Sequence, residues 1–273
     1  MDSEQRGLLA EIENAELSQE ATAAPADALA ELALPTVSRR SALLDLVLIL
    51  LTFGVTWFGG GWIGGITWTA FGVSGLAKIA GDAARLVVAA GVIAYLLWHN
   101  HLSCRSFGLR WDDLESQLLW TAATIGADFI LAALTLVLYQ VLVRALQPGL
   151  PNLAAWLQTS HSRPGPAHAD ARLFLYFLPA LWEELFHRGL FIPYLRRLTG
   201  RWWVACTVSA FVFGAIHLAY GPLAAFMALL AGLIYGFVFI RTRSVLPAFG
   251  AHLMWNVITR AHMGWLLGLL RPV

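Results

Sequence analysis

Residues 202–241 read WWVACTVSAFVFGAIHLAYGPLAAFMALLAGLIYGFVFIR and carry a single arginine, Arg241, at their end. A helix needs about 20 predominantly apolar residues to cross the hydrocarbon core of a bilayer, so this stretch predicts two spans, at 202–219 and 222–241. Strands of a transmembrane barrel would instead alternate in polarity over about ten residues. The stretch therefore indicates an all-α membrane protein.

The same criterion applies to the rest of the chain. It predicts further spans near 42–62, 83–99, 117–146, 172–195 and 246–262, and the apolar tail Gly264–Leu270 could extend the last one. The predicted fold is an all-α, polytopic transmembrane helix bundle of seven to eight spans. We expect four regions: an acidic, mobile N-terminal tail (1–38), N-terminal transmembrane helices with an interfacial segment (39–171), a transmembrane core (172–262) and a C-terminal tail (263–273).

The composition excludes several classes of protein. Hydrophobic residues make up 58% of the chain and charged residues 13%, against about 25% charged residues in soluble domains. A soluble enzyme, a disordered regulator and a secreted disulfide scaffold are therefore excluded as main interpretations. The formal net charge of +1 gives no indication of a nucleic-acid partner.

The arginines predict the orientation in the membrane. If the N-terminus is inside, the inner loops collect nine of them: Arg39, Arg40, Arg105, Arg110, Arg196, Arg197, Arg201, Arg241 and Arg243. Cytoplasmic loops are enriched in Lys and Arg, so this bias favours a cytoplasmic N-terminus. We expect an integral, multi-pass protein of a bacterial-type cell membrane.

The fourth predicted span contains an unusual group of charges in Leu181-Trp182-Glu183-Glu184-Leu185-Phe186-His187-Arg188-Gly189. A charge within a span costs roughly 2.5–3.5 kcal/mol, so it requires an explanation. Glu184 and Arg188 are four residues apart and can pair on one helix face. Glu183 is turned by about 100° from Glu184 and is left without that arginine. A structural ion pair explains Glu184 and Arg188, but it does not explain Glu183.

Two later spans contribute further polar groups. His217 ends the fifth span, and the seventh span holds His252 and Asn256, which are one helical turn apart. A carboxylate can deprotonate a water, and imidazole and amide donors can stabilise an oxyanion, so hydrolysis is one interpretation. Zinc is the other, because Glu183, His217 and His252 would make a three-ligand site with an open position. The sequence leaves both open.

Other polar and small residues have simpler explanations. We assign Asp45, Asp82 and Asp128 structural or interfacial roles. Gly232-x-x-x-Gly236 predicts close helix packing. His187, four residues after Glu183, is a weaker candidate for supporting the site.

Together, Glu183-Glu184-x-x-x-Arg188, Phe213-x-x-x-His217 and His252-x-x-x-Asn256 resemble, in order and spacing, the three motifs of the CPBP family of intramembrane proteases. That family includes the type II CAAX prenyl endopeptidases and the Abi-type bacteriocin-immunity proteins. The resemblance covers about residues 172–257, and Phe107-Gly108-Leu109-Arg110 weakly resembles a segment that precedes the family core.

The resemblance implies a helical membrane fold with a catalytic cavity inside the bundle. Glu183 would activate the water with help from His217, His252 and Asn256 would hold the oxyanion, and Glu184 with Arg188 would support the site. We therefore expect an intramembrane CAAX-type protease, glutamate-dependent or metallo-endopeptidase, whose partners are the bilayer and a membrane-embedded or lipid-anchored peptide or protein. The alternatives are a non-catalytic binding or immunity protein of the same fold and a proton-coupled transporter.

Overall fold

The computed structural model describes residues 32–71, 74–146 and 169–269, and every regular element within these ranges is helical. The elements are α2 (Arg39–Phe71), α3 (Ser74–His99), η1 (Cys104–Phe107), α4 (Leu114–Leu146), α6 (Ala169–Glu184), η2 (Leu185–Phe191), α7 (Ile192–Thr199), α8 (Trp202–Ile216), η3 (His217–Tyr220), α9 (Pro222–Thr242) and α10 (Leu246–Leu269). The predicted all-α membrane bundle is thus confirmed. Residues 147–168 of the predicted region 39–171 and residues 1–31 of the predicted tail lie outside the described residues.

Each predicted span coincides with helix. Five segments in the described part of the chain are long and apolar enough to cross a membrane: Arg39–Gly59, Ala77–His99, Leu114–Thr135, Trp202–Tyr220 and Pro222–Thr242. The fourth predicted span differs from a simple helix, because it consists of α6, the π-helical segment η2 and α7 in direct succession. A π-helix closes its hydrogen bonds from i to i+5, so the angular spacing assumed from an α-helix does not hold through η2.

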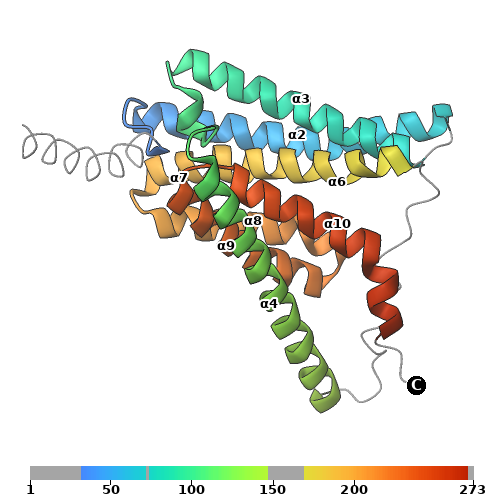
Figure 1. Cartoon of the computed structure of the whole chain (residues 1–273). Coiled ribbons are helices and arrows are strands. Elements are labelled where there is room, and N and C mark those ends of the chain that lie inside the picture. Colours follow the sequence, from blue (N-terminus) through green and yellow to red (C-terminus); the bar gives the residue numbers. More distant parts are fainter. Residues whose placement is uncertain (1–31, 72–73, 147–168, 270–273) are drawn as a thin grey trace, which may run out of the picture.

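The helices pack in two groups (Figure 1). Helices α2, α3 and α6 lie side by side, while α8, α9 and α10 lie beneath them, and α4 crosses this second group at a steep angle. The main hydrophobic core joins α2 and α3 to the η2 segment and includes Phe53, Leu96, Trp182, Phe186 and Phe191. The polar residues of η2 are therefore held between the two groups of helices.

The end of the predicted N-terminal tail belongs to the core. Leu32, Leu34 and Val37 are 1%, 0% and 2% exposed, so the expectation of a mobile segment through residue 38 is wrong for this part. Burial of three apolar side chains stabilises the ordered conformation. The tail therefore joins the bundle by residue 32, seven residues before α2 begins.

Glycines bring α8 and α9 close together, as predicted for the Gly232-x-x-x-Gly236 pattern. A Cβ atom on Gly232 would lie 3.0 Å from Ala210 Cα, and one on Gly236 would lie 3.1 Å from Cys206 Sγ. The absence of side chains at these two positions lets the helix backbones approach. The tight α8–α9 pair positions the residues that surround the site.

The segment between α3 and α4 supports the start of α10. Gly108 has a left-handed backbone (φ +70°), and a Cβ there would lie 2.5 Å from the Phe239 ring. Its carbonyl accepts a hydrogen bond from Val245 N at 3.0 Å, and Ser244 Oγ donates to Gln117 Oε1 at 2.6 Å. The weakly recognised segment at Phe107–Arg110 thus anchors the turn from which α10, and with it His252, begins.

Candidate active site

The site is built where α6 becomes η2. Helix α6 ends at Glu184, and all seven residues of η2, Leu185–Phe191, are buried. π-Helical turns are rare and occur frequently at functional sites, because the extra residue per turn redirects side chains. Here Glu183 and Glu184 lie immediately before the change of helix type, and His187 and Arg188 lie within it.

Glu184 is the centre of a buried polar network. Its Oε1 accepts a hydrogen bond from Arg188 Nη1 at 3.0 Å and a second from His252 Nδ1 at 2.8 Å. The side chains of Glu184 and Arg188 are 0% and 1% exposed, and that of His252 is 8% exposed. Arg188 Nη2 also donates to the Gly232 carbonyl at 3.4 Å. The pair predicted within one helix is therefore present, and it is joined by a histidine from α10.

The hydrogen bond to Glu184 determines how His252 is oriented. A carboxylate only accepts hydrogen bonds, so the His252 Nδ1 atom carries the proton in this contact. The other ring nitrogen, Nε2, then faces Glu183, whose Oε2 lies 3.9 Å away. Glu183 Oε2 has no hydrogen-bond partner within the described part of the chain. One carboxylate thus holds the histidine, while the neighbouring carboxylate faces its reactive nitrogen.

Two aromatic rings hold this network from either side. The guanidinium carbon of Arg188 lies 4.8 Å from the ring centroid of Phe213 on α8 and 5.0 Å from that of Tyr235 on α9. The same rings lie 5.8 Å and 5.9 Å from the His252 ring. Tyr235 in turn donates its hydroxyl hydrogen to Asp128 Oδ2 of α4 at 2.7 Å. We call Phe213 and Tyr235 the aromatic clamp.

No pattern in the sequence directly indicates the aromatic clamp. Phe213 was part of a motif only through His217, and Tyr235 lies beside Gly236 in the predicted packing pattern. Asp128 was assigned a structural or interfacial role, and its contact with Tyr235 places it behind the site. The sequence places a tyrosine and an aspartate within two predicted spans, where polar side chains need partners. Nothing in their spacing indicates that they contact each other.

His217 and Asn256 are near the network but not joined to it. The His217 ring Nδ1 lies 2.8 Å from the Phe213 carbonyl, so Nδ1 donates and Nε2 is left as an acceptor. Its ring lies 4.7 Å from the Phe213 ring, but no hydrogen bond or ion pair connects it to Glu183 within the described residues. Asn256 is 8% exposed and donates to the Tyr176 carbonyl over a long 3.4 Å.

The proposed zinc ligands do not form a coordination sphere. Within residues 32–71, 74–146 and 169–269, no three His, Cys, Asp or Glu side chains are grouped as metal ligands would be. Glu183 Oε2 and His252 Nε2 lie 3.9 Å apart, but in the described residues no third such side chain joins them in a metal-like group. The geometry therefore does not fit the zinc set of Glu183, His217 and His252.

His187 is buried for packing. It is 0% exposed, and its ring meets the rings of Phe53, Phe191 and Phe213 edge to face, with centroid distances of 5.0–5.6 Å. Neither ring nitrogen has a hydrogen-bond partner in the described structure, so the predicted contact with Glu183 is not made. Its backbone carbonyl accepts from Ser209 Oγ at 2.9 Å, which ties η2 to α8.

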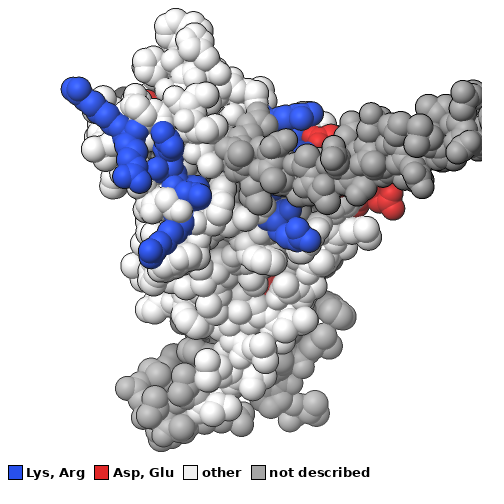
Figure 2. Space-filling model, turned by 90° about the vertical axis from the view of Figure 1, so that its left-hand side faces the viewer, with Lys and Arg blue, Asp and Glu red and all other residues white. Residues whose placement is uncertain are grey.

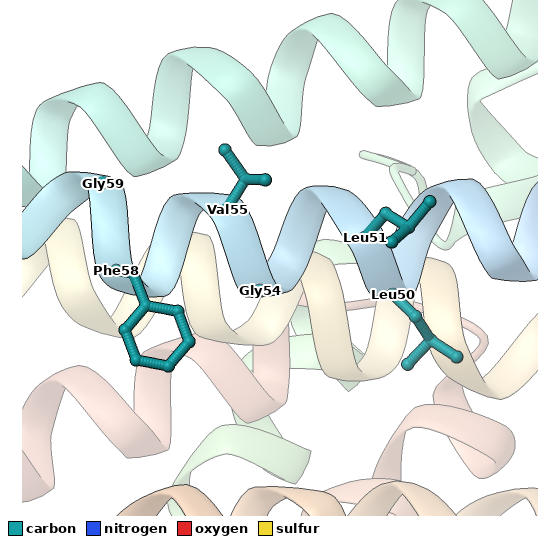
Figure 3. Close-up of a pocket in the computed structure, with 6 residues that line it drawn as sticks. All are labelled: Leu50, Leu51, Gly54, Val55, Phe58 and Gly59. Atoms are coloured by element: carbon teal, nitrogen blue, oxygen red, sulfur yellow. The ribbon is translucent and has the colours of Figure 1, made fainter.

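A pocket on the outside of α2 is separate from this network. It is lined by Leu50, Leu51, Gly54, Val55, Phe58 and Gly59, which Figure 3 shows along one helix. Leu51, Val55 and Phe58 are 64–78% exposed, and none of the lining residues can ionise. A spanning helix must present apolar side chains where it contacts lipid, and these exposed side chains meet that requirement. This pocket therefore does not carry the chemistry.

The family model described as type II CAAX prenyl endopeptidase Rce1-like matches residues 170–258. This range contains all of α6 but its first residue, η2, α7–α9, the first half of α10, and all seven named residues of the three motifs. The match confirms the resemblance inferred from those motifs. No curated protein and no solved structure matches the chain.

Proposed function

We infer that this chain, whose residues 170–258 match the model of type II CAAX prenyl endopeptidase Rce1-like proteins, is an intramembrane endopeptidase that uses Glu183 to activate water. Its substrate would be a membrane-embedded or lipid-anchored peptide of the CAAX type. The observation that carries this proposal is the pair Glu183 and His252, whose Oε2 and Nε2 atoms face each other at 3.9 Å. At this separation no direct hydrogen bond joins the two atoms, and both can lie within hydrogen-bond distance of one water beside them.

Glu183 is the proposed base. Its Oε2 atom, without a hydrogen-bond partner in the described chain, would take a proton from water as the water oxygen attacks the scissile carbonyl carbon. The carbonyl oxygen becomes an oxyanion; when this intermediate collapses to the carboxylic acid, the C–N bond breaks and the captured proton is delivered to the leaving amine nitrogen. Glu184 is less suited to this role, because its carboxylate is fully buried, ion-paired with Arg188 and bonded to His252.

His252 is the proposed oxyanion partner. When Nε2 also carries a proton, the ring is an imidazolium whose positive charge is stabilised by the Glu184 carboxylate at Nδ1. A carboxylate behind a histidine has the same effect in serine hydrolases, where it fixes the tautomer and stabilises the charged ring. Asn256 would add an amide donor, since its long bond to the Tyr176 carbonyl is weak enough to exchange for a substrate oxygen.

His217 would assist the water through Nε2, the nitrogen left available by its bond to the Phe213 carbonyl. The orientation of the chain is also part of the proposal. Arg39 and Arg40 begin α2, and Arg201 begins α8, at the same end of the bundle as the last turn of α9. An excess of arginine marks the cytoplasmic side, so we assign this end and the N-terminus to the cytoplasm.

The test is cleavage of an internally quenched, farnesylated CAAX peptide by the purified protein in nanodiscs. Glu183→Gln keeps the size of the side chain but removes the base, and we expect kcat to fall by about 10²–10⁴-fold with unchanged thermal stability. The matched control is Glu115→Gln, the same substitution on the exposed first turn of α4, which should cleave normally. Cleavage by Glu183→Gln at the wild-type rate would show that the mechanism is wrong.

A further inference from the structure

Arginines concentrate at one end of the bundle, which we call the basic end. Figure 2 views the molecule from this end and shows basic side chains spread over its surface. It consists of Arg39, Arg40, Arg105, Arg110, Arg196, Arg197, Arg201, Arg241 and Arg243. Two contacts show that these segments meet: Arg197 Nε donates to the Val37 carbonyl, and Val245 N donates to the Gly108 carbonyl.

The basic end carries more positive charge than its own acids balance. Four acids lie in the described segments that carry these nine arginines: Asp45, which is buried and accepts from Asn100, and Asp112, Asp113 and Glu115. Asp112 is already paired with Arg110. Burial, together with the charges of Arg110 and Arg241, lowers the pKa of Arg243. Like charges are thus held close together, and an anion at this end would relieve their repulsion.

The N-terminal segment enters the structure at the same end. Leu32 packs with Ile192, Phe239 and Val245, which lie near the ends of the helices that carry the arginines. Leu34 and Val37 follow in the main core. Residue 31 is therefore attached directly beside the basic end, by an anchor that is itself buried.

The segment attached there is strongly acidic. Residues 1–31 contain one arginine, Arg6, and eight acids: Asp2, Glu4, Glu11, Glu13, Glu16, Glu20, Asp27 and Glu31. A tethered segment of this length acts on a neighbouring surface at an effective concentration of order millimolar. We propose that residues 1–31 dock on the basic end of their own bundle through these carboxylates. The docked segment would shield the arginines from other anions at the membrane surface.

Anionic lipid headgroups are the competing occupant, since the basic end lies where spanning helices leave the bilayer. The tail differs from a lipid in being covalently attached beside the arginines, so its local concentration does not depend on the membrane composition. Docking should therefore occur in membranes of zwitterionic lipid and persist when anionic lipid is added. This difference separates the two occupants.

The first measurement is cleavage of the tail by a glutamate-specific protease, with the full-length protein in phosphatidylcholine nanodiscs. A docked glutamate is protected, so wild type should be cut more slowly than the free peptide 1–31. Each arginine near an opposite charge contributes roughly fivefold to binding. Replacing exposed Arg105, Arg201 and Arg241 together with Gln should therefore speed cleavage by about tenfold or more.

The matched control is Lys78→Gln, which removes a positive charge near the start of α3, away from the basic end, and should leave protection intact. Raising the salt from 0.15 M to 1 M shortens the Debye length from about 8 Å to about 3 Å, and should release the tail in wild type. Six arginines remain in the triple variant, so its orientation in the membrane is maintained.

The second measurement uses the natural cysteines. Cys104 lies exposed at the basic end, whereas Cys206 is buried, so a nitroxide can be placed on Cys104 alone. It should broaden the amide resonances of residues 1–31 in wild type and not in the triple variant. Equal cleavage of wild type, triple variant and free peptide would overturn the proposal. Protection that disappears in nanodiscs containing 30% phosphatidylglycerol would also overturn it, and would assign the basic end to lipid.

Discussion

Replacing Arg188 with methionine tests whether the network around Glu184 depends on charge. Arg188 is 1% exposed, donates to Glu184 and to the Gly232 carbonyl, and lies between the two rings of the aromatic clamp. Methionine fills much of the same space and can pack against both rings, but it cannot neutralise a carboxylate. The substitution leaves Glu184 buried with His252 as its one remaining hydrogen-bond donor in the described structure.

The magnitude follows from burial. Removing one partner of a fully buried ion pair costs about 3–5 kcal/mol, because the other charge stays buried without compensation. Loss of the cation–π contacts adds about 0.5–2 kcal/mol, part of which methionine restores by packing. We therefore expect the free energy of unfolding of Arg188→Met to fall by about 3–5 kcal/mol.

The assay is reversible unfolding in mixed micelles, with Glu184→Gln and the double variant Glu184→Gln/Arg188→Met measured beside the single one. Removing both charges eliminates the uncompensated carboxylate, and buried pairs replaced together are often neutral in stability. The double variant should accordingly be more stable than Arg188→Met by about 2 kcal/mol or more. Arg188→Met and the double variant should both have a lower kcat. In the double variant His252 loses the negative charge at Nδ1, and in Arg188→Met the Glu184 carboxylate that holds His252 loses its own partner.

The comparison between Arg188→Met and the double variant decides whether lost charge or lost packing causes the instability. If the double variant is as unstable as Arg188→Met, the loss comes from packing against Phe213 and Tyr235. The reasoning from buried charge would then be refuted, whatever the effect on cleavage.

Two further substitutions test the surroundings of the network. Tyr235→Phe keeps the clamp ring but removes the hydroxyl that donates to Asp128, so the free energy of unfolding should fall by about 1–3 kcal/mol. Its kcat should drop at unchanged KM. The control is Trp120→Phe, which alters another contact between α4 and α9 and should not change kcat. An unchanged kcat in Tyr235→Phe would show that the contact between Tyr235 and Asp128 does not support catalysis. Gly232→Leu forces side-chain atoms against α8 and should lower the free energy of unfolding by about 1–3 kcal/mol. The control Gly91→Leu, at a position where a Cβ meets nothing within 4 Å, should be tolerated. Equal shifts in the melting temperature of the two variants would argue against close α8–α9 packing.

Features within one helix could be read from the sequence. The long apolar run at 202–241 specifies two spanning helices, since only a helix satisfies its own backbone in lipid. Glu184 and Arg188 pair because residues four apart share a helix face. Gly232 and Gly236 likewise lie on one face and make the close contact with α8. For the two spans and the two glycines, the 3.6-residue period relates positions along a single element, while Glu184 and Arg188 pair across the change from α6 to the π-helical η2.

Contacts between helices were decided by the tertiary structure. The seven motif residues were known, but only packing shows that Glu184 holds His252, that Glu183 faces the opposite nitrogen, and that His217 is bonded elsewhere. The clamp of Phe213 and Tyr235 was not foreseen. These contacts depend on how helices cross and on the π-helical turn at 185–191, which shifts side chains from the positions a regular helix would give them. A periodic pattern specifies which side of a helix is apolar, and it does not specify which neighbour that side meets.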